Sequence, residues 1–138
     1  MIDMMMGEFV TLLQTKLPVK IVVLNNGTLG FVEMEMKATG FLDTNVDLTN
    51  PNFAKMAQAM GIKGVRVEAP QELHAAVQEV LQYDGPALLD VVTARQELVM
   101  PPATTFDEAH KFGVFMLKAV LDGRAKELID LAKVNLTR

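Results

Sequence analysis

Two adjacent asparagines stand where an apolar run stops. The run Ile21–Leu24 is followed directly by Asn25, Asn26 and Gly27. An asparagine at a strand end can offer its amide oxygen to a hard cation such as Mg2+, which prefers oxygen ligands. A backbone carbonyl two residues further on, in a tight turn, can be aimed at the same ion, because Gly27 gives the turn its conformational freedom. The pair of asparagines is therefore a candidate metal-binding feature, although two ordinary turn asparagines after a strand would give the same pattern.

The composition limits the class of protein. The chain has 138 residues, half of them hydrophobic, which suits one domain with an ordinary core and excludes wholesale disorder. It has no cysteine, so disulfides, zinc–thiolate sites, iron–sulfur clusters and cysteine nucleophiles are excluded together. The net charge of −4 gives no reason to expect nucleic acid as a partner. No apolar run approaches the ~20 residues of a membrane span, so we expect a cytoplasmic protein.

The elements that must position the asparagines alternate between helix and strand. Apolar spacing predicts short strands within residues 19–26, 64–68 and 86–92. It predicts helices at residues 4–16, from residue 31 on, at 50–61, from 70 on, at 106–121 and at 124–136. This order predicts an α/β fold, a parallel sheet with flanking helices plus a C-terminal helical tail. Ligands of such sheets bind at the carboxyl ends of the strands, which is where the asparagines stand.

Some local details can also be predicted. Asn50 is a suitable N-cap for the helix at 50–61, with Pro51 as its first residue. Arg66 alternates with two valines, so we expect it on the solvent side of its strand. Glu33 and Glu35 are two positions apart, so they point to different faces of a helix, and both would ordinarily be solvated.

The stretch "LPVKIVVLNNGTLGF" resembles the second half of the cofactor-binding signature of thiamine diphosphate-dependent enzymes. That signature is Gly-Asp-Gly, followed at a distance by Asn-Asn at the end of an apolar strand. The resemblance continues through "FVEMEMKATGF", "NFAKMAQAMGIKGVRVE", "DGPALLDVV" and "ELIDLAKVNLTR". Within the family the chain looks most like the C-terminal part of the flavin-containing pyruvate oxidases, including the quinone-dependent pyruvate dehydrogenase that yields acetate and CO2.

The resemblance implies roles for individual residues. Asn26, by its side chain, and Thr28, by its carbonyl, would bind the Mg2+ that holds the cofactor's diphosphate. Phe31 and Glu35 match positions that line the substrate pocket near the thiazolium, so they are the candidate catalytic residues. The implied cofactor-binding residues are Asn25, which would support the turn, and Asn26, Gly27, Thr28, Leu29 and Gly30.

Some features of the family pattern are missing from this chain, and these differences bear on its function as much as the matches do. The Gly-Asp-Gly half, the catalytic glutamate and the flavin-binding domain of the family have no counterpart in these residues. The chain therefore looks like a fragment. We expect residues 1–100 to be the C-terminal part of a truncated diphosphate-binding domain and residues 101–138 to be a helical tail. The implied cofactors are thiamine diphosphate and Mg2+, with FAD in the parent enzyme, and the isolated chain is expected to be inactive.

The resemblance also implies partners. These are pyruvate and a quinone for the parent enzyme and a second copy of the chain as a homo-oligomer, with no nucleic acid. The tail carries Lys126, Lys133 and Arg138 beside an apolar stripe, which suits either packing or contact with a lipid surface on the inner face of the cell membrane. Two alternatives stay open: a non-catalytic α/β binding or interaction module, and part of an acetolactate synthase-like enzyme.

Overall fold

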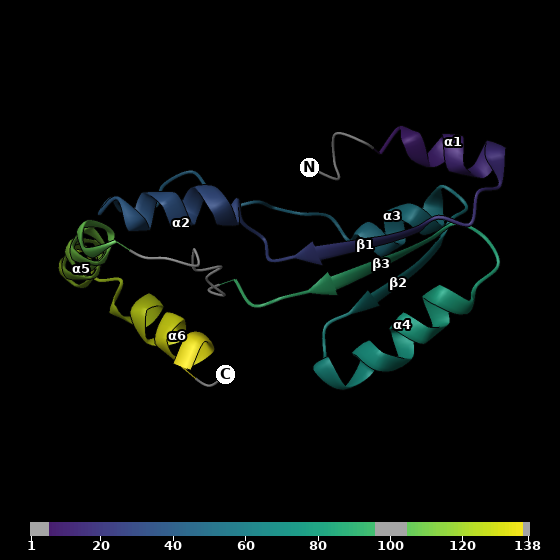
Figure 1. Cartoon of the computed structure of the whole chain (residues 1–138). Coiled ribbons are helices and arrows are strands. Elements are labelled where there is room, and N and C mark those ends of the chain that lie inside the picture. Colours follow the sequence, from purple (N-terminus) through teal and green to yellow (C-terminus); the bar gives the residue numbers. More distant parts are fainter. Residues whose placement is uncertain (1–5, 96–104, 137–138) are drawn as a thin grey trace. The chain divides into compact units, whose positions relative to one another are not determined.

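The computed structural model describes residues 6–95 and 105–136 (Figure 1). Its residues form two compact units. The sheet unit comprises Met1–Asn25 and Asn50–Thr93, and the helical unit comprises Asn26–Thr49 and Ala94–Arg138. The boundary expected at residue 100 lies outside the described residues, so that division stays a prediction.

The sheet unit is built on three parallel strands, β1 (Lys20–Asn25), β2 (Lys63–Val67) and β3 (Ala87–Val92). Their order is β1-β3-β2, with β3 in the centre. Asn25 stands opposite Val92, and Val67 stands opposite Val91, so all three strands end along the same edge. The predicted α/β fold with a parallel sheet and flanking helices is confirmed.

Helices cover both faces of this sheet (Figure 1). On one face, α1 (Glu8–Thr15) and α3 (Phe53–Ala59) bury a cluster that includes Leu88. On the other face, α4 (Leu73–Gln82), preceded by the short helix η2 (Pro70–Glu72), packs over a cluster that includes Leu89. Leu88 and Leu89 are neighbours on β3 and point to opposite faces, as the strand geometry requires.

The contact between α3 and β2 depends on a glycine. A Cβ at Gly64 would lie 2.1 Å from the backbone carbonyl oxygen of Ala54. No side chain fits in that space, because real Cβ atoms essentially never approach closer than 3.0 Å. The backbones of α3 and β2 therefore touch directly.

The start of α3 differs from the prediction. The N-cap is Asn52, whose side-chain oxygen accepts a hydrogen bond from the Lys55 amide at 2.8 Å. The prediction of Asn50 as the cap, with Pro51 as the first helical residue, is wrong. Asn50 instead donates its side-chain amide to Asn25, 2.9 Å away. Two asparagines were available for one cap, and a contact distant in sequence engages the first of them.

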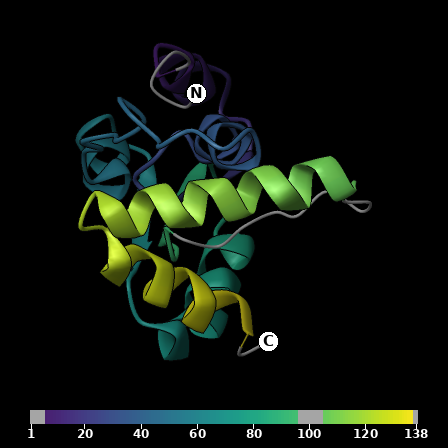
Figure 2. The same ribbon diagram turned by 90° about the vertical axis from the view of Figure 1, so that its left-hand side faces the viewer.

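The helical unit contains α2 (Gly30–Ala38), α5 (Phe106–Leu121) and α6 (Ala125–Leu136). Figure 2 shows α5 and α6 as consecutive helices joined by a short turn. The helices predicted at 106–121 and 124–136 are confirmed almost to the residue. Within residues 6–95 and 105–136, no helix combines the length and apolar character needed to cross a bilayer.

Local signals explain why α5 begins where it does. The Thr105 hydroxyl accepts a hydrogen bond from the Glu108 amide, and the Glu108 carboxylate accepts one from the Thr105 amide, which is a capping box. Bonding from the backbone and side chain of Thr105 holds the pKa of Glu108 below its ordinary value.

Candidate functional site

The turn that follows β1 is closed by the second asparagine. The side-chain oxygen of Asn26 accepts a hydrogen bond from the Thr28 amide at 3.2 Å. Gly27, between them, adopts φ +68°, a left-handed conformation that other residues rarely tolerate. A Cβ at Gly30 would lie 3.0 Å from the side-chain nitrogen of Asn26, so the absence of a side chain there makes room for the amide. The sequence Asn-Gly-Thr-Leu-Gly thus brings the two predicted metal ligands into one tight turn.

The backbone around Thr28 is pinned to the loop that follows α2. The Leu29 amide donates to the Val46 carbonyl, and the Leu48 amide donates to the Gly27 carbonyl, both at 2.9 Å. These bonds form an antiparallel bridge centred on Thr28 and Asp47. The conformation of residue 28 is therefore fixed on both sides by bonds to a distant part of the chain.

The first asparagine is held in the sheet unit. Asn25 is buried, and its side-chain nitrogen donates to the Asp90 carboxylate at 3.2 Å. Asp90 is fully buried, and it also accepts hydrogen bonds from the Phe53 amide at 3.2 Å and from Arg66 at 2.5 Å. One carboxylate on the central strand therefore ties together the end of β1, the start of α3 and β2.

Arg66 is only partly on the solvent side of its strand. It joins the buried Asp90 to the exposed Glu68, to which its Nε donates at 2.7 Å. The hydrogen bond to Glu68 raises the pKa of the Arg66 guanidinium, and the hydrogen bond and charge of Asp90 raise it further. Burial lowers this pKa but does not cancel the increase. The expectation that Arg66 lies on the solvent side of its strand is confirmed only in part, because Asp90, on β3, binds one end of its guanidinium in the interior.

A buried ion pair supports Thr28 from within the helical unit. The Thr28 hydroxyl donates to the Glu33 carboxylate at 2.6 Å. Glu33 is 4% exposed and pairs, at 2.7 Å, with Lys37 one turn further along α2. The expectation that Glu33 is solvated is therefore wrong. Its different orientation from Glu35 is as expected, since Glu35 is exposed.

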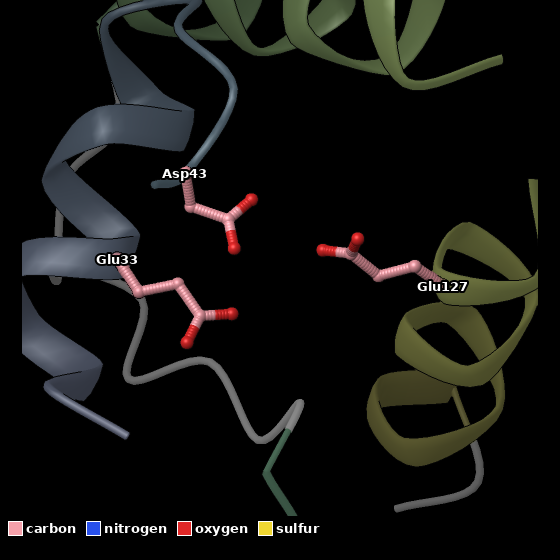
Figure 3. Close-up of side chains that lie close together, drawn as sticks. All are labelled: Glu33, Asp43 and Glu127. Atoms are coloured by element: carbon pink, nitrogen blue, oxygen red, sulfur yellow. The ribbon is translucent and has the colours of Figure 1, made fainter. Parts of the chain in front are cut away.

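Glu33, Asp43 and Glu127 form a group of three neighbouring carboxylates (Figure 3). One ligand atom from each lies within 4.8 Å of the others, a spacing at which three carboxylates could hold a metal ion. Two cations already stand among them. Lys37 Nζ lies 2.7 Å from Glu33 Oε1 and 2.8 Å from Glu127 Oε1, while Arg124 Nη2 lies 2.7 Å from Asp43 and 2.5 Å from Glu127. The protein's own cations compensate these charges, so the group carries no metal assignment.

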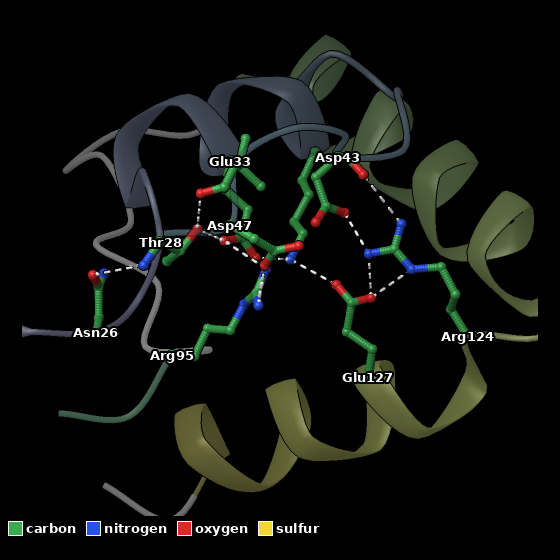
Figure 4. A network of polar contacts seen from close by, with 10 residues as sticks. Asn26, Thr28, Glu33, Asp43, Asp47, Arg95, Arg124 and Glu127 are labelled. Atoms are coloured by element: carbon green, nitrogen blue, oxygen red, sulfur yellow. Dashed lines mark hydrogen bonds and ion pairs between the residues drawn. The ribbon is translucent and has the colours of Figure 1, made fainter. Parts of the chain in front are cut away.

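The same network extends to Arg95 (Figure 4). Arg95 lies 3.8 Å from the Glu33 carboxylate and forms an ion pair with Asp47. Burial lowers the pKa of Arg124. The hydrogen bond to Asp43 and the negative charges of Asp43 and Glu127 outweigh this effect, so the pKa is raised. The ionic network thus joins the Thr28 turn, α2, the following loop and α6.

The two candidate catalytic residues are exposed. Phe31 is 72% exposed, and Glu35 lies one turn away on the same side of α2. The structure therefore brings them onto a common accessible face, while Glu33 and Lys37 point inward from the same helix.

The donors of the turn suit a hard cation only in part. The Asn26 side chain and the Thr28 carbonyl supply neutral oxygens, and the Asn26 oxygen can accept the Thr28 amide bond with one lone pair and ligate with the other. The buried carboxylates Glu33 and Asp43 are committed to Lys37 and Arg124. The residues fit half of a Mg2+–diphosphate site, and the negatively charged ligands of the ion would have to come from groups outside this turn. Sequence reasoning missed Asp90, Lys37, Arg124 and Glu127 as supports, because each also has a partner distant in the chain, as in Lys37–Glu127, Arg124–Asp43 and Asn25–Asp90.

Comparison with known proteins agrees with this geometry. Residues 2–91 match the family model described as thiamine pyrophosphate enzyme, C-terminal TPP binding domain. A Bacillus subtilis protein described as thiamine pyrophosphate-containing, YdaP, is 34% identical over 131 residues, which are 95% of this chain and 23% of that protein. The acetolactate synthase of Schizosaccharomyces pombe is 38% identical over 108 residues, 76% of this chain and 16% of that enzyme. The acetolactate synthase catalytic subunit of Aspergillus candidus is 36% identical over 115 residues, 82% of this chain and 16% of the subunit.

The chain therefore spans less than a quarter of the length of these relatives. The family match covers β1, the asparagine turn and the rest of the sheet almost to the end of β3. The chain belongs to the thiamine pyrophosphate enzyme family, of which it carries the C-terminal cofactor-binding domain.

Proposed function

We propose that this chain is part of a thiamine diphosphate- and FAD-dependent pyruvate oxidase that converts pyruvate to acetate and CO2 and passes the electrons to a quinone. The observation that carries the proposal is the turn after β1, in which the Asn26 side chain and Thr28 are held together by one hydrogen bond at 3.2 Å. In the proposed holoenzyme, both oxygens bind the Mg2+ of the cofactor.

Each residue of the turn has a distinct task in this proposal. Asn26 and Thr28 contribute neutral ligands, Gly27 gives the turn its left-handed residue, and Asn25 anchors its start to Asp90. When bound, thiamine diphosphate supplies the stabilised carbanion on which decarboxylation of a 2-oxo acid depends. Phe31 and Glu35, exposed on α2, contact the substrate.

Acetolactate synthase is the second candidate, favoured by the relatives of that name. The preference for the oxidase rests on the resemblance of the segment "FVEMEMK" and of the tail to that class of enzyme. The match to the Bacillus protein extends over 95% of the chain, whereas the two synthases match 76% and 82% of it.

A chimera tests the proposal. Residues 1–138 would replace the matching stretch of the Bacillus protein, and Mg2+-dependent binding of thiamine diphosphate would be measured by calorimetry. We expect wild-type residues to bind, Asn26→Ala to weaken binding at least tenfold, and the exposed Gln78→Ala on α4 to leave it unchanged. Equal binding by the Asn26→Ala chimera would rule out this asparagine as a ligand.

The product made from pyruvate separates the two candidate enzymes. Acetate with reduction of a quinone supports the oxidase, whereas acetolactate supports the synthase. A chimera that folds and turns over pyruvate by neither route would favour the non-catalytic module.

The 138-residue chain on its own is proposed to bind Mg2+–thiamine diphosphate weakly. Neutral oxygens alone compensate little of the charge of the ion and the diphosphate. Micromolar binding by the isolated chain in calorimetry would contradict this.

We also propose that the parent enzyme binds peripherally to the inner face of the cell membrane through the tail. Helix α6 carries Lys126 and Lys133 on exposed positions, and Ile129 is 53% exposed. Such a helix can lie on an anionic lipid surface. Flotation of the chimera with anionic vesicles, with and without residues 116–138, tests this; equal partitioning would contradict it.

A further inference from the structure

We propose that Glu33 and Lys37 are positioning residues for the Thr28 turn, and that α6 completes this support through Glu127. The inference deepens the proposed function, because Thr28 is one of the two proposed metal ligands. No part of it requires a metal ion among the three carboxylates.

The first link runs from the turn to α2. The Thr28 side chain is buried, and its hydroxyl lies 2.6 Å from Glu33 Oε2 and 3.1 Å from the Val46 carbonyl oxygen. A hydroxyl has a single proton to donate, and a carboxylate is the stronger acceptor. The Glu33 carboxylate therefore adds a side-chain anchor to residue 28 and supports the backbone bonds at Leu29 and Leu48 that hold its carbonyl.

The second link fixes Glu33 itself. Its other oxygen is 2.7 Å from the Lys37 ammonium, which is 0% exposed. Burying both charges is strongly unfavourable unless each keeps a partner with good geometry. Lys37 therefore constrains Glu33 more tightly than an exposed pair at the same spacing would.

The third link reaches the end of the chain. Lys37 lies 2.8 Å from Glu127 Oε1, and the other Glu127 oxygen is paired with Arg124 at 2.5 Å. Arg124 also holds Asp43 at 2.7 Å, in the loop between α2 and the bridge partner Asp47. The first turn of α6 thus closes a series of contacts that begins at Thr28 (Figure 4).

The experiment uses the full 138-residue chain and two NMR readouts. The first is amide hydrogen exchange at Leu29 and Leu48, whose bonds flank Thr28. The second is signal broadening by Mn2+, a paramagnetic substitute for Mg2+, at Asn26 and Thr28. We expect Glu127→Gln to speed exchange at both amides at least tenfold, with exchange within α5 unchanged, and to reduce the Mn2+ broadening at least threefold.

Two further variants separate positioning from folding. Thr28→Val replaces the hydroxyl by a methyl group and leaves the ion pairs intact. It should reproduce the faster amide exchange and the weaker Mn2+ broadening, while Thr28→Ser should behave like the wild type. Asp107→Asn is the matched control, because Asp107 and Lys111 form an exposed pair at the same spacing on α5. It should change neither readout.

The outcomes for this inference and for the proposed function are distinguishable. Unchanged exchange at Leu29 and Leu48 in both Glu127→Gln and Thr28→Val would overturn the positioning role, whatever Mn2+ does. Faster exchange in these variants supports the role. Unchanged Mg2+-dependent binding of thiamine diphosphate by the Asn26→Ala chimera, with the exchange effects present in the 138-residue chain, would contradict the proposed ligand role instead.

Discussion

Asp90 is a residue on which polar contacts from three segments of the sheet unit converge. Its fully buried carboxylate is bonded to Asn25, to Arg66 and to the backbone amide at the first residue of α3. Arg66, with 26% of its side chain exposed, carries the balancing charge. The carboxylate is thus satisfied by three segments that are far apart in the chain.

Replacing Asp90 by Asn should destabilise the chain by about 3 kcal/mol, because it removes the charge that compensates Arg66 and weakens the bonds to Asn25 and Phe53. Urea unfolding measures this. The control Glu68→Gln removes the exposed partner of the same arginine and should cost about 0.5 kcal/mol or less. Equal losses in the two variants would show that burial of Asp90 contributes nothing.

At the residue scale, the sequence indicates which side chains could bind a ligand but not which residues they contact. Asn26 and Thr28 could be singled out because they match a family signature that is short and local in the chain. The burial of Glu33 could not, because its environment is completed by Glu127, which lies on another helix near the end of the chain. A charged residue is predicted to be solvated as long as its ion-pair partner is unknown.

At the scale of elements, two glycines offer a matched comparison. Gly64 lies against the backbone of α3, whereas a Cβ at Gly113 in α5 would have no atom within 4 Å. The first glycine is required by packing, and the second only lowers the helix propensity of its segment.

Gly64→Ala should therefore destabilise the chain by about 2 kcal/mol or more, because α3 must move away from β2. Gly113→Ala should stabilise it by roughly 0.5–1 kcal/mol, since alanine favours the helix and meets no obstacle. Thermal or urea unfolding of the two variants checks both signs. A neutral Gly64→Ala would mean that α3 can shift on the sheet at little cost.

The helices that the sequence predicted best carry their own signals. Helix α5 has its capping box at Thr105 and Glu108, and Gly123 adopts φ +79° between α5 and α6. The start of α3 was misplaced because Asn50 and Asn52 are equally good caps, and the choice depends on a bond from Asn50 to Asn25. Local chemistry defines an element's boundary only when no distant contact competes for the same residue.

At the scale of the whole molecule, the sheet has an exposed apolar edge strand. Among residues 6–95 and 105–136, β1 has one neighbour in the sheet, β3, and Val22 and Leu24 on it are 57% and 70% exposed. An apolar strand that is exposed at a sheet edge is a template for pairing with another chain. The parallel sheet was predictable from the alternation of elements, but the division of contacts into two units was not, because each unit combines segments that are distant in sequence.

We therefore expect the 138-residue chain to self-associate through β1, in agreement with the predicted homo-oligomer. Val22→Lys combined with Leu24→Lys should shift the chain to monomer, while Leu81→Lys, at a residue of α4 that is 63% exposed, should not. Sedimentation across a concentration series measures this. A monomeric wild-type chain at high concentration would contradict the expectation.

The complete burial of Lys37 has a consequence for its chemical reactivity. Amine-selective reagents need access to the unprotonated nitrogen, and this ammonium is enclosed between two carboxylates with no exposed surface. Exposed lysines such as Lys16, Lys55 and Lys126 should be modified rapidly, whereas Lys37 should react only when the first turn of α6 detaches. The labelling kinetics of this one lysine, followed by mass spectrometry, would therefore report the opening of α6 in the unmodified protein.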